Sequence, residues 1–184
     1  MRNLCTIIFL ALILASCKKE TLPKPAPYLK LQYPEATYKK IESSGPFTFE
    51  ISNFTKIDFK NKYWTSIEYP QLKATIHLTY RPVNTDLDQI LKEVEKLTFE
   101  HTIKADAINA VPYENLEKRV FAKLYNIEGS VATNIQFRAT DSVKHVLSGA
   151  LYFYTRPNYD SIVPAIKYVE KDIIHLIETL EWKE

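Results

Sequence analysis

The feature that most limits how this chain can fold is a short apolar run near its N-terminus that ends at a cysteine. Leu4–Leu14 is almost wholly apolar, and two small residues, Ala15 and Ser16, precede Cys17. A charged start, an apolar segment and small residues before a cleavage site are typical of a secretory signal peptide. The run is also too short for a membrane-spanning helix, which needs about 20 residues. We therefore predict a lipoprotein signal peptide over residues 1–16 and a diacylglycerol anchor on Cys17, the alternative being an ordinary signal peptide with an unrelated cysteine.

The chain has two cysteines, and both fall in this N-terminal region. Cys5 lies in the segment to be removed, and Cys17 would become the membrane anchor. The mature protein would then have no disulfide and no thiolate ligand for a metal, although the periplasm allows disulfides. We therefore expect its stability to come from a hydrophobic core alone.

Composition excludes several classes of function. The formal net charge is +2, and glycine occurs only three times. Proteins that bind nucleic acid usually show a clustered basic face and a high pI, and phosphate-binding loops need several glycines. We therefore expect no nucleic-acid partner and no glycine-rich phosphate loop.

The sequence divides into an anchor region and one domain. Residues 17–27 hold the predicted lipidated cysteine and a tether in which Pro23, Pro25 and Pro27 alternate with other residues. Such a pattern favours an extended polyproline conformation, which at ~3.1 Å per residue would span about 30 Å. We predict a single globular domain over residues 28–184, the first part of which (to residue 46) is an irregular lead-in.

Hydrophobic periodicity predicts two long helices and a set of strands. Apolar residues recur at helical spacing over residues 85–105 and 161–180, with Pro164 tolerated in the first turn of the second helix. Alternating or apolar runs predict strands at 47–52, 74–80, 120–127, 131–139 and 145–155. The turn at Glu128–Gly129 indicates a hairpin, and the last run is apolar on both faces, as expected of a central strand.

The order of these elements is strands, one helix, three strands and a second helix. It predicts an α+β fold with a mostly antiparallel sheet and two long helices packed on it. That layout is similar to the compact sheet-and-helix domains of the PsbP/Mog1 type. The similarity concerns the fold alone, and it implies nothing about activity.

The histidines allow only weak arguments for chemistry. His101 could act as a base held by Asp106, or it could close the end of the first helix by a hydrogen bond. His175 lies three residues after Asp172 on the second helix, so the two could share a metal or make a simple contact on the helix surface. Ser148 lacks the Gly-x-Ser-x-Gly pattern of a hydrolase, and Gly149 beside it indicates a bend or close packing.

Aromatic residues offer a second kind of candidate site. Tyr63, Trp64 and Tyr69 could stack on a sugar, or they could belong to the core or to a protein interface. The residues themselves leave these alternatives open.

Four blocks of the chain resemble a known family. They are residues 74–80, 101–108, 149–153 and 172–179, which read ATIHLTY, HTIKADAI, GALYF and DIIHLIET. With the lipobox and the Pro-Lys-Pro tether, these blocks are similar to the gliding motility lipoprotein GldD of the Bacteroidetes. The resemblance implies a cell-envelope lipoprotein needed for gliding and tied to type IX secretion. Because the family has no established catalytic activity, the resemblance implies no enzyme, no cofactor and no metal, and only the lipidation role carries over, to Cys17.

The function predicted from the residues and the resemblance together is a non-enzymatic accessory or assembly protein of the gliding machinery. It would be held at the membrane by its lipid and would bind envelope proteins. The candidate interface residues are Tyr63, Trp64, His101, Lys104 and Asp106. The alternative is a ligand-binding or glycan-binding envelope lipoprotein, and a hydrolase or metalloenzyme is a third interpretation.

The residues after the anchor bear on which membrane holds it. Lys18 stands where an aspartate retains lipoproteins in the inner membrane of some bacteria. Export to the cell surface in this phylum is associated with acidic residues after the cysteine, which Lys18-Lys19-Glu20 fits poorly. We therefore favour the periplasmic face of the outer membrane.

Overall fold

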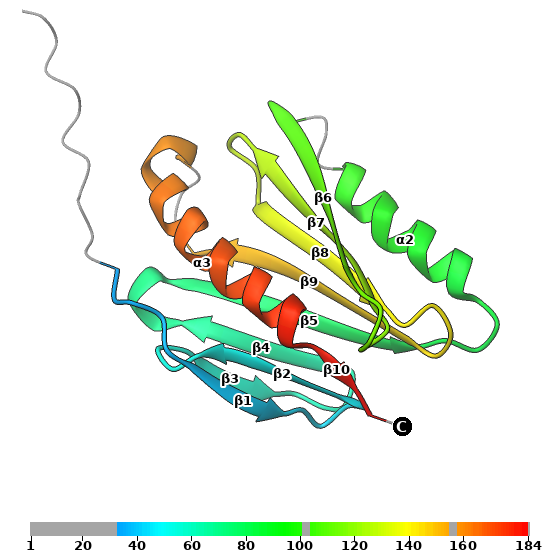
Figure 1. The fold of residues 1–184 in the computed structure, drawn as a ribbon. Helices are drawn as coiled ribbons and strands as arrows, with labels where there is room; N and C mark the ends of the chain where they lie inside the picture. The colour runs from blue at the N-terminus through cyan, green and yellow to red at the C-terminus, as the bar shows by residue number, and fades with distance from the viewer. Residues whose placement is uncertain (1–32, 101–103, 155–157, 184) are drawn as a thin grey trace, which may run out of the picture. The chain divides into compact units, whose positions relative to one another are not determined.

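Alternation of apolar and polar residues along the chain produces two antiparallel sheets. The computed structural model describes residues 33–100, 104–154 and 158–183, all of which belong to one compact unit. The smaller sheet has the order β1-β2-β10, with β1 at Tyr38–Glu42, β2 at Phe47–Ser52 and β10 at Glu181–Trp182. The larger sheet has seven strands (Figure 1). Their order is β3 (Lys56–Phe59), β4 (Trp64–Tyr69), β5 (Ala74–Pro82), β9 (His145–Phe153), β8 (Thr133–Thr140), β7 (Val120–Glu128) and β6 (Ala107–Asn115).

The core lies on one face of the larger sheet, which we call the inner face. Alternate residues of its strands, such as Ile76 and Leu78 of β5, are buried there together with Phe47 and Phe49 of β2. The long helix α3 (Tyr159–Thr179) contributes its apolar stripe to the same cluster. Residues of both sheets and of α3 therefore share one hydrophobic core.

The shorter helix, α2 (Leu87–Phe99), buries much less of its surface. Only Ile90 and Thr98 of this helix are buried. Thr98 donates a hydrogen bond to Oε1 of Gln136 on β8 at 2.8 Å, and Glu95 accepts one from the Tyr125 hydroxyl at 3.1 Å. Both sheet residues point away from the inner face, so α2 contacts the opposite, outer face of the larger sheet.

Several sequence predictions are confirmed and others are wrong. The α+β class, the antiparallel pairing, the hairpin at Glu128–Gly129 and the central place of β9 are confirmed. The first helix ends at Phe99 rather than near Ala105, because residues 104–106 already form the turn into a further strand, β6. Four strands rather than three therefore separate the two helices. The prediction of an irregular segment up to residue 46 is also wrong, because β1 forms within it.

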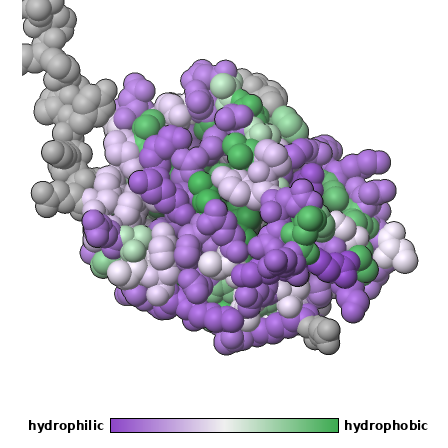
Figure 2. Space-filling model, in the orientation of Figure 1, coloured by the Kyte–Doolittle hydropathy of each residue, from purple (hydrophilic) through white to green (hydrophobic). Residues whose placement is uncertain are grey.

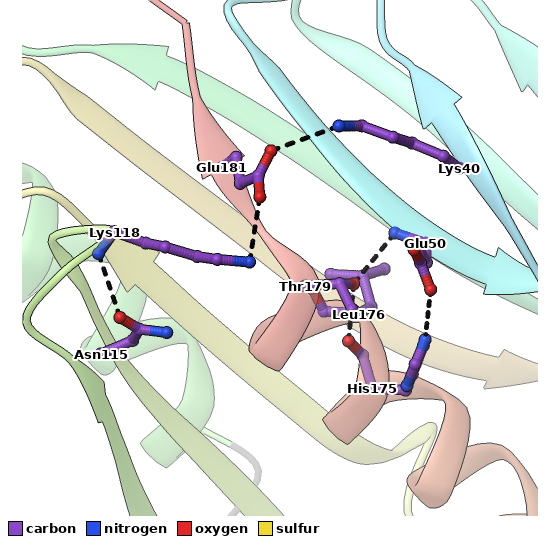
Figure 3. A network of polar contacts seen from close by, with 8 residues as sticks. All are labelled: Lys40, Glu50, Asn115, Lys118, His175, Leu176, Thr179 and Glu181. Atoms are coloured by element: carbon purple, nitrogen blue, oxygen red, sulfur yellow. Dashed lines mark hydrogen bonds and ion pairs between the residues drawn. The ribbon is translucent and has the colours of Figure 1, made fainter.

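A polar network joins β1, β2 and the β6–β7 turn to α3 and β10 (Figure 3). Glu181 of β10 accepts ion-pair contacts from Lys40 of β1 at 3.3 Å and from Lys118 in the β6–β7 turn at 3.0 Å. On α3, the Thr179 hydroxyl accepts a hydrogen bond from the backbone N–H of Glu50 on β2 at 3.0 Å. Exposed ion pairs contribute little stability each, so this network fixes the position of β10 more than it strengthens the fold.

Candidate functional site

Tyr63 and Trp64, two of the predicted interface residues, lie at the start of β4 and are exposed. The Trp64 side chain is 57% exposed and that of Tyr63 is 38% exposed. Asn61 Oδ1 accepts hydrogen bonds from the backbone N–H groups of both residues, at 2.8 and 3.0 Å, and Tyr63 stacks on Tyr80. Tyr69 is instead buried in the core, so it cannot stack on a sugar. Trp64 is therefore the aromatic residue of this group with the largest free surface.

Lys104 and Asp106 lie at the other edge of the larger sheet, just before β6. Both are exposed, and the N–H of Asp106 donates to the Glu128 carbonyl at 2.9 Å. Four strands separate β4 from β6, so at about 4.8 Å per strand these two strands lie roughly 24 Å apart across the sheet. The two groups also lie toward opposite ends of their strands, because the register places Trp64 in the row of Pro112, six residues after Asp106. Lys104 and Asp106 therefore cannot share one small site with Trp64. His101 and Cys17 lie outside the described residues.

A groove lies on the outer face of the larger sheet, beside α2. Its volume is about 450 Å³, and its lining includes His77 of β5, Tyr152 of β9 and Gln136 of β8. The His77 and Tyr152 rings are 5.6 Å apart, and Leu97 of α2 forms part of the wall. A concave site with aromatic rings and a few polar groups is the usual form of a small-ligand site. Periodicity could not locate this groove, because its residues come from three strands and a helix that are far apart in the sequence.

A serine–histidine pair lies at the edge of this groove. Ser66 Oγ is 3.1 Å from Nδ1 of His77, and the Tyr154 hydroxyl is 3.5 Å from Nε2 of the same ring. Nucleophilic catalysis by serine needs a histidine base that a third group, usually a carboxylate, orients. Here the group at the other ring nitrogen of His77 is the Tyr154 hydroxyl rather than a carboxylate. Sequence reasoning missed this pair because the two residues are separated by a turn and carry no motif.

A buried carboxylate, Asp172, forms a second polar cluster. The hydroxyls of Tyr38 and Tyr69 each donate to one of its oxygens at 3.0 Å, and Asp172 is only 3% exposed. Burial raises the pKa of Asp172, and the two hydrogen bonds offset that rise only in part. Burial and the nearby carboxylate raise the pKa of Tyr38 to about 12. The cluster joins β1, β4 and α3 and leaves the Tyr168 hydroxyl buried without a hydrogen bond of normal geometry among the described residues.

The predicted surface contact between His175 and Asp172 is wrong. His175 Nε2 lies 2.8 Å from a carboxylate oxygen of Glu50 on β2, and its ring stacks on Tyr38. Asp172 points into the core instead because it lies on the apolar stripe of α3, three residues after the buried Val169 and four before Leu176. That position in the stripe is a signal from which its burial could have been predicted. In the described ranges, no three His, Cys, Asp or Glu side chains gather closely enough to hold a metal.

The prediction of close packing at Gly149 is confirmed. A Cβ atom at this position would lie 2.2 Å from Cε1 of Phe137, so the phenylalanine ring occupies the space that a side chain would need. Ser148 lies inside β9 and, at 3.4 Å, contacts the Thr79 carbonyl. These two residues therefore belong to the packing of the central strands.

Most of the surface in view is hydrophilic, with hydrophobic side chains scattered among the polar ones (Figure 2). The described part of the chain has no helix that is both long enough and apolar enough to cross a bilayer.

Comparison with known proteins supplies the family. A model of the gliding motility lipoprotein GldD family matches residues 18–182. No curated protein matches the chain. Because the match extends over nearly the whole sequence and covers the described fold as far as Trp182, the chain belongs to the GldD family of gliding motility lipoproteins.

Proposed function

We propose that this protein is a lipid-anchored, non-enzymatic component of the gliding machinery, linked to type IX secretion, that acts by binding other envelope proteins. The observation that carries the proposal is the family match, which begins directly after Cys17. A lipid on that cysteine would hold the domain at a membrane, and the proline-rich tether would set its distance from the surface. The periplasmic face of the outer membrane is the location that Lys18 and Lys19 favour.

Two exposed groups near opposite edges of the larger sheet support a binding role, one on β4, which is next to the edge strand β3, and one just before the edge strand β6. Tyr63 and Trp64 present aromatic surface, which is enriched in protein interfaces, whereas Lys104 and Asp106 present charges of both signs. The strands that carry them lie roughly 24 Å apart across the sheet, which is more than a single small contact would need. We propose that the protein contacts its neighbours at both edges and so bridges two parts of the machinery.

The proposed role is tested first in cells. We would delete the gene and complement the deletion with the wild type or with Cys17→Ala, and then measure colony spreading and single-cell movement on glass. We expect both forms of movement to be lost in the deletion and restored only by the wild type. Normal gliding of the deletion strain would refute a role in motility, and full restoration by Cys17→Ala would refute the need for the anchor.

The binding surfaces are tested by photo-crosslinking. A benzophenone amino acid would replace Trp64 or Asp106, and Phe54, an aromatic residue of similar exposure in the β2–β3 turn, would serve as the control position. We expect each edge position to give a crosslinked band that the control lacks. Crosslinks of equal yield at all three positions would show that neither edge is a specific interface.

The non-enzymatic part of the proposal has its own test. Ser66→Ala removes the hydroxyl beside His77 and leaves the ring in place. We expect gliding and type IX secretion to continue unchanged in this variant, provided that immunoblots show normal protein levels. Loss of gliding at normal levels would favour acyl-transfer chemistry at the serine–histidine pair over a purely binding role.

A further inference from the structure

The outer face of the larger sheet carries small side chains in the middle and large ones around them. Strand register places Ser66, His77, Ala150 and Gln136 in one row across β4, β5, β9 and β8. The row consists of a hydroxyl, an imidazole, a methyl group and an amide. Side chains directly opposite one another on neighbouring strands lie about 5 Å apart, so these groups form a continuous strip.

The next row continues the same pattern. It places Trp64 opposite Thr79, and Thr79 opposite Ser148. The two hydroxyl residues are short, whereas the indole of Trp64 stands at the end of the row and is largely exposed. Ser148 is in turn opposite Arg138 of β8, so this row runs from an aromatic ring through two hydroxyl groups to an arginine.

The helix α2 closes one side of the floor that these two rows form. Val94, Leu97 and Glu100 contribute to the groove, and the hydrogen bond from Thr98 to Gln136 holds the helix against the sheet. The resulting volume of about 450 Å³ is within the range of small-ligand sites. The groove thus has an apolar helix wall, a hydroxyl-lined floor and aromatic rings.

Polar groups in the groove still have hydrogen bonds to make. Gln136 uses one end of its amide for Thr98, and within the described ranges neither the other end nor the Tyr152 hydroxyl has a hydrogen-bond partner. The free NH2 group of Gln136 can donate two hydrogen bonds, and a phenol can both donate and accept. The side chains that line the groove include Glu100 but no lysine or arginine in the part of the chain that the structure describes.

These properties discriminate between classes of ligand. Among the lining residues, an acidic or phosphorylated ligand would meet the Glu100 carboxylate and no lysine or arginine. The guanidinium of Arg138, opposite Ser148 in the neighbouring row, is directed to the Tyr125 hydroxyl. A peptide could not extend the sheet here, because β4, β5, β9 and β8 are each paired on both sides. A purely apolar ligand would leave the hydroxyl and amide groups of the floor without partners. A sugar ring, by contrast, has an apolar C–H face that suits an aromatic ring and hydroxyl edges that suit the free amide and phenol.

We propose that the groove between α2 and the outer face of the sheet, together with Trp64 beside its lining residue Thr79, binds a neutral oligosaccharide. Trp64 and Tyr152 contact sugar rings, and Gln136 hydrogen-bonds to sugar hydroxyls. The inference rests on the groove itself and does not depend on the role in gliding. It gives the protein a second contact with the cell envelope besides its lipid anchor.

The experiment uses the full lipidated protein in a zwitterionic detergent, because detergents with a sugar headgroup would compete for the groove. The probes are triacetylchitotriose and maltotriose as neutral trisaccharides and trigalacturonic acid as an acidic one. Saturation-transfer NMR and calorimetry would measure the Kd for the wild type, Trp64→Ala and Gln136→Ala. Phe54→Ala removes a similarly exposed aromatic ring away from the groove and is the matched control.

We expect at least one neutral trisaccharide to bind and the acidic one to bind more weakly. Trp64→Ala and Gln136→Ala should each raise the Kd about tenfold, and Phe54→Ala should leave it unchanged. Because Trp64 is exposed, its variant keeps the test decisive even if Gln136→Ala loosens α2. The proposal is overturned if no neutral trisaccharide shows saturable binding below about 10 mM, if the acidic sugar binds best, or if Phe54→Ala weakens binding as much as Trp64→Ala does.

Discussion

Gly149→Ala should destabilise the protein through a single contact at the centre of the larger sheet. Gly149 lies on β9 between Leu78 of β5 and Phe137 of β8. A Cβ atom there would be 2.2 Å from Cε1 and 2.6 Å from Cζ of Phe137, and 3.0 Å from Cδ2 of Leu78. Both neighbours are buried, so neither ring nor methyl group can move out into solvent. The added methyl group must therefore displace the Phe137 ring within a closely packed core.

The size of the effect follows from two opposing contributions. Forcing one extra methyl group into a packed core costs about 1–3 kcal/mol. Alanine also restricts the unfolded chain relative to glycine, which returns about 0.4–1 kcal/mol. We expect a net loss of about 1–2 kcal/mol, which for a chain of this length lowers the Tm by about 2–8 °C.

Urea unfolding followed by circular dichroism measures this loss, with Ser148→Ala as the control on the opposite face of the same strand. We expect the control to change stability by less than about 0.5 kcal/mol. Phe137→Leu should relieve the clash. The double variant should therefore lose less stability than the sum of the losses in the two single variants. A Gly149→Ala variant as stable as the wild type, or strictly additive losses in the double variant, would refute the packing argument.

Three further predictions concern buried and hydrogen-bonded carboxylates, and each is checked by urea unfolding. Because burial raises the folded-state pKa of Asp172, its contribution to stability is complete below the unfolded pKa and is lost as the pH rises through the folded one. The free energy of unfolding of Asp172→Asn should therefore rise relative to that of the wild type between pH 4 and pH 7. A difference in unfolding free energy that stays constant over this range would contradict this. Tyr38→Phe, which removes a 3.0 Å hydrogen bond to Asp172, should cost about 1–3 kcal/mol at neutral pH, and a loss below about 0.5 kcal/mol would show that the bond contributes little. Burial raises the pKa of Asp141, but hydrogen bonds from three backbone N–H groups outweigh it and leave the pKa lowered, so the cost of Asp141→Ala should shrink as the pH falls through that lowered value. If Asp141→Ala lost as much stability at acid pH as at neutral pH, the lowered pKa of Asp141 would not be the cause.

The elements that the sequence predicted are those whose own residues carry a strong periodic signal. The apolar stripe of α3 and the alternation along β5, β7 and β8 each report one buried face, which local spacing records directly. Strands β1, β3, β4, β6 and β10 were missed, and two of them, β6 and β1, show how an edge strand lacks this signal. Strand β6 is an edge strand with Pro112 in it and no buried residue, and β1 has lysines at two of its five positions. An edge strand forms because its neighbour offers unpaired backbone N–H and C=O groups. The cause of strand formation in β6 and β1 therefore lies in their partners β7 and β2, and the sequences of β6 and β1 do not show it.

The same reasoning explains what could be known of the candidate sites. Lipidation at Cys17 depends on a local motif, so the sequence alone predicts it. The groove beside α2 depends on register, since His77, Ala150 and Gln136 become neighbours only when β5, β9 and β8 are paired in one order. Strand order is set by packing between distant segments, and a single sequence does not encode it in any short window. The lipid anchor and the candidate interface residues could therefore be predicted from the sequence, whereas the proposed sugar groove had to be found in the folded sheet.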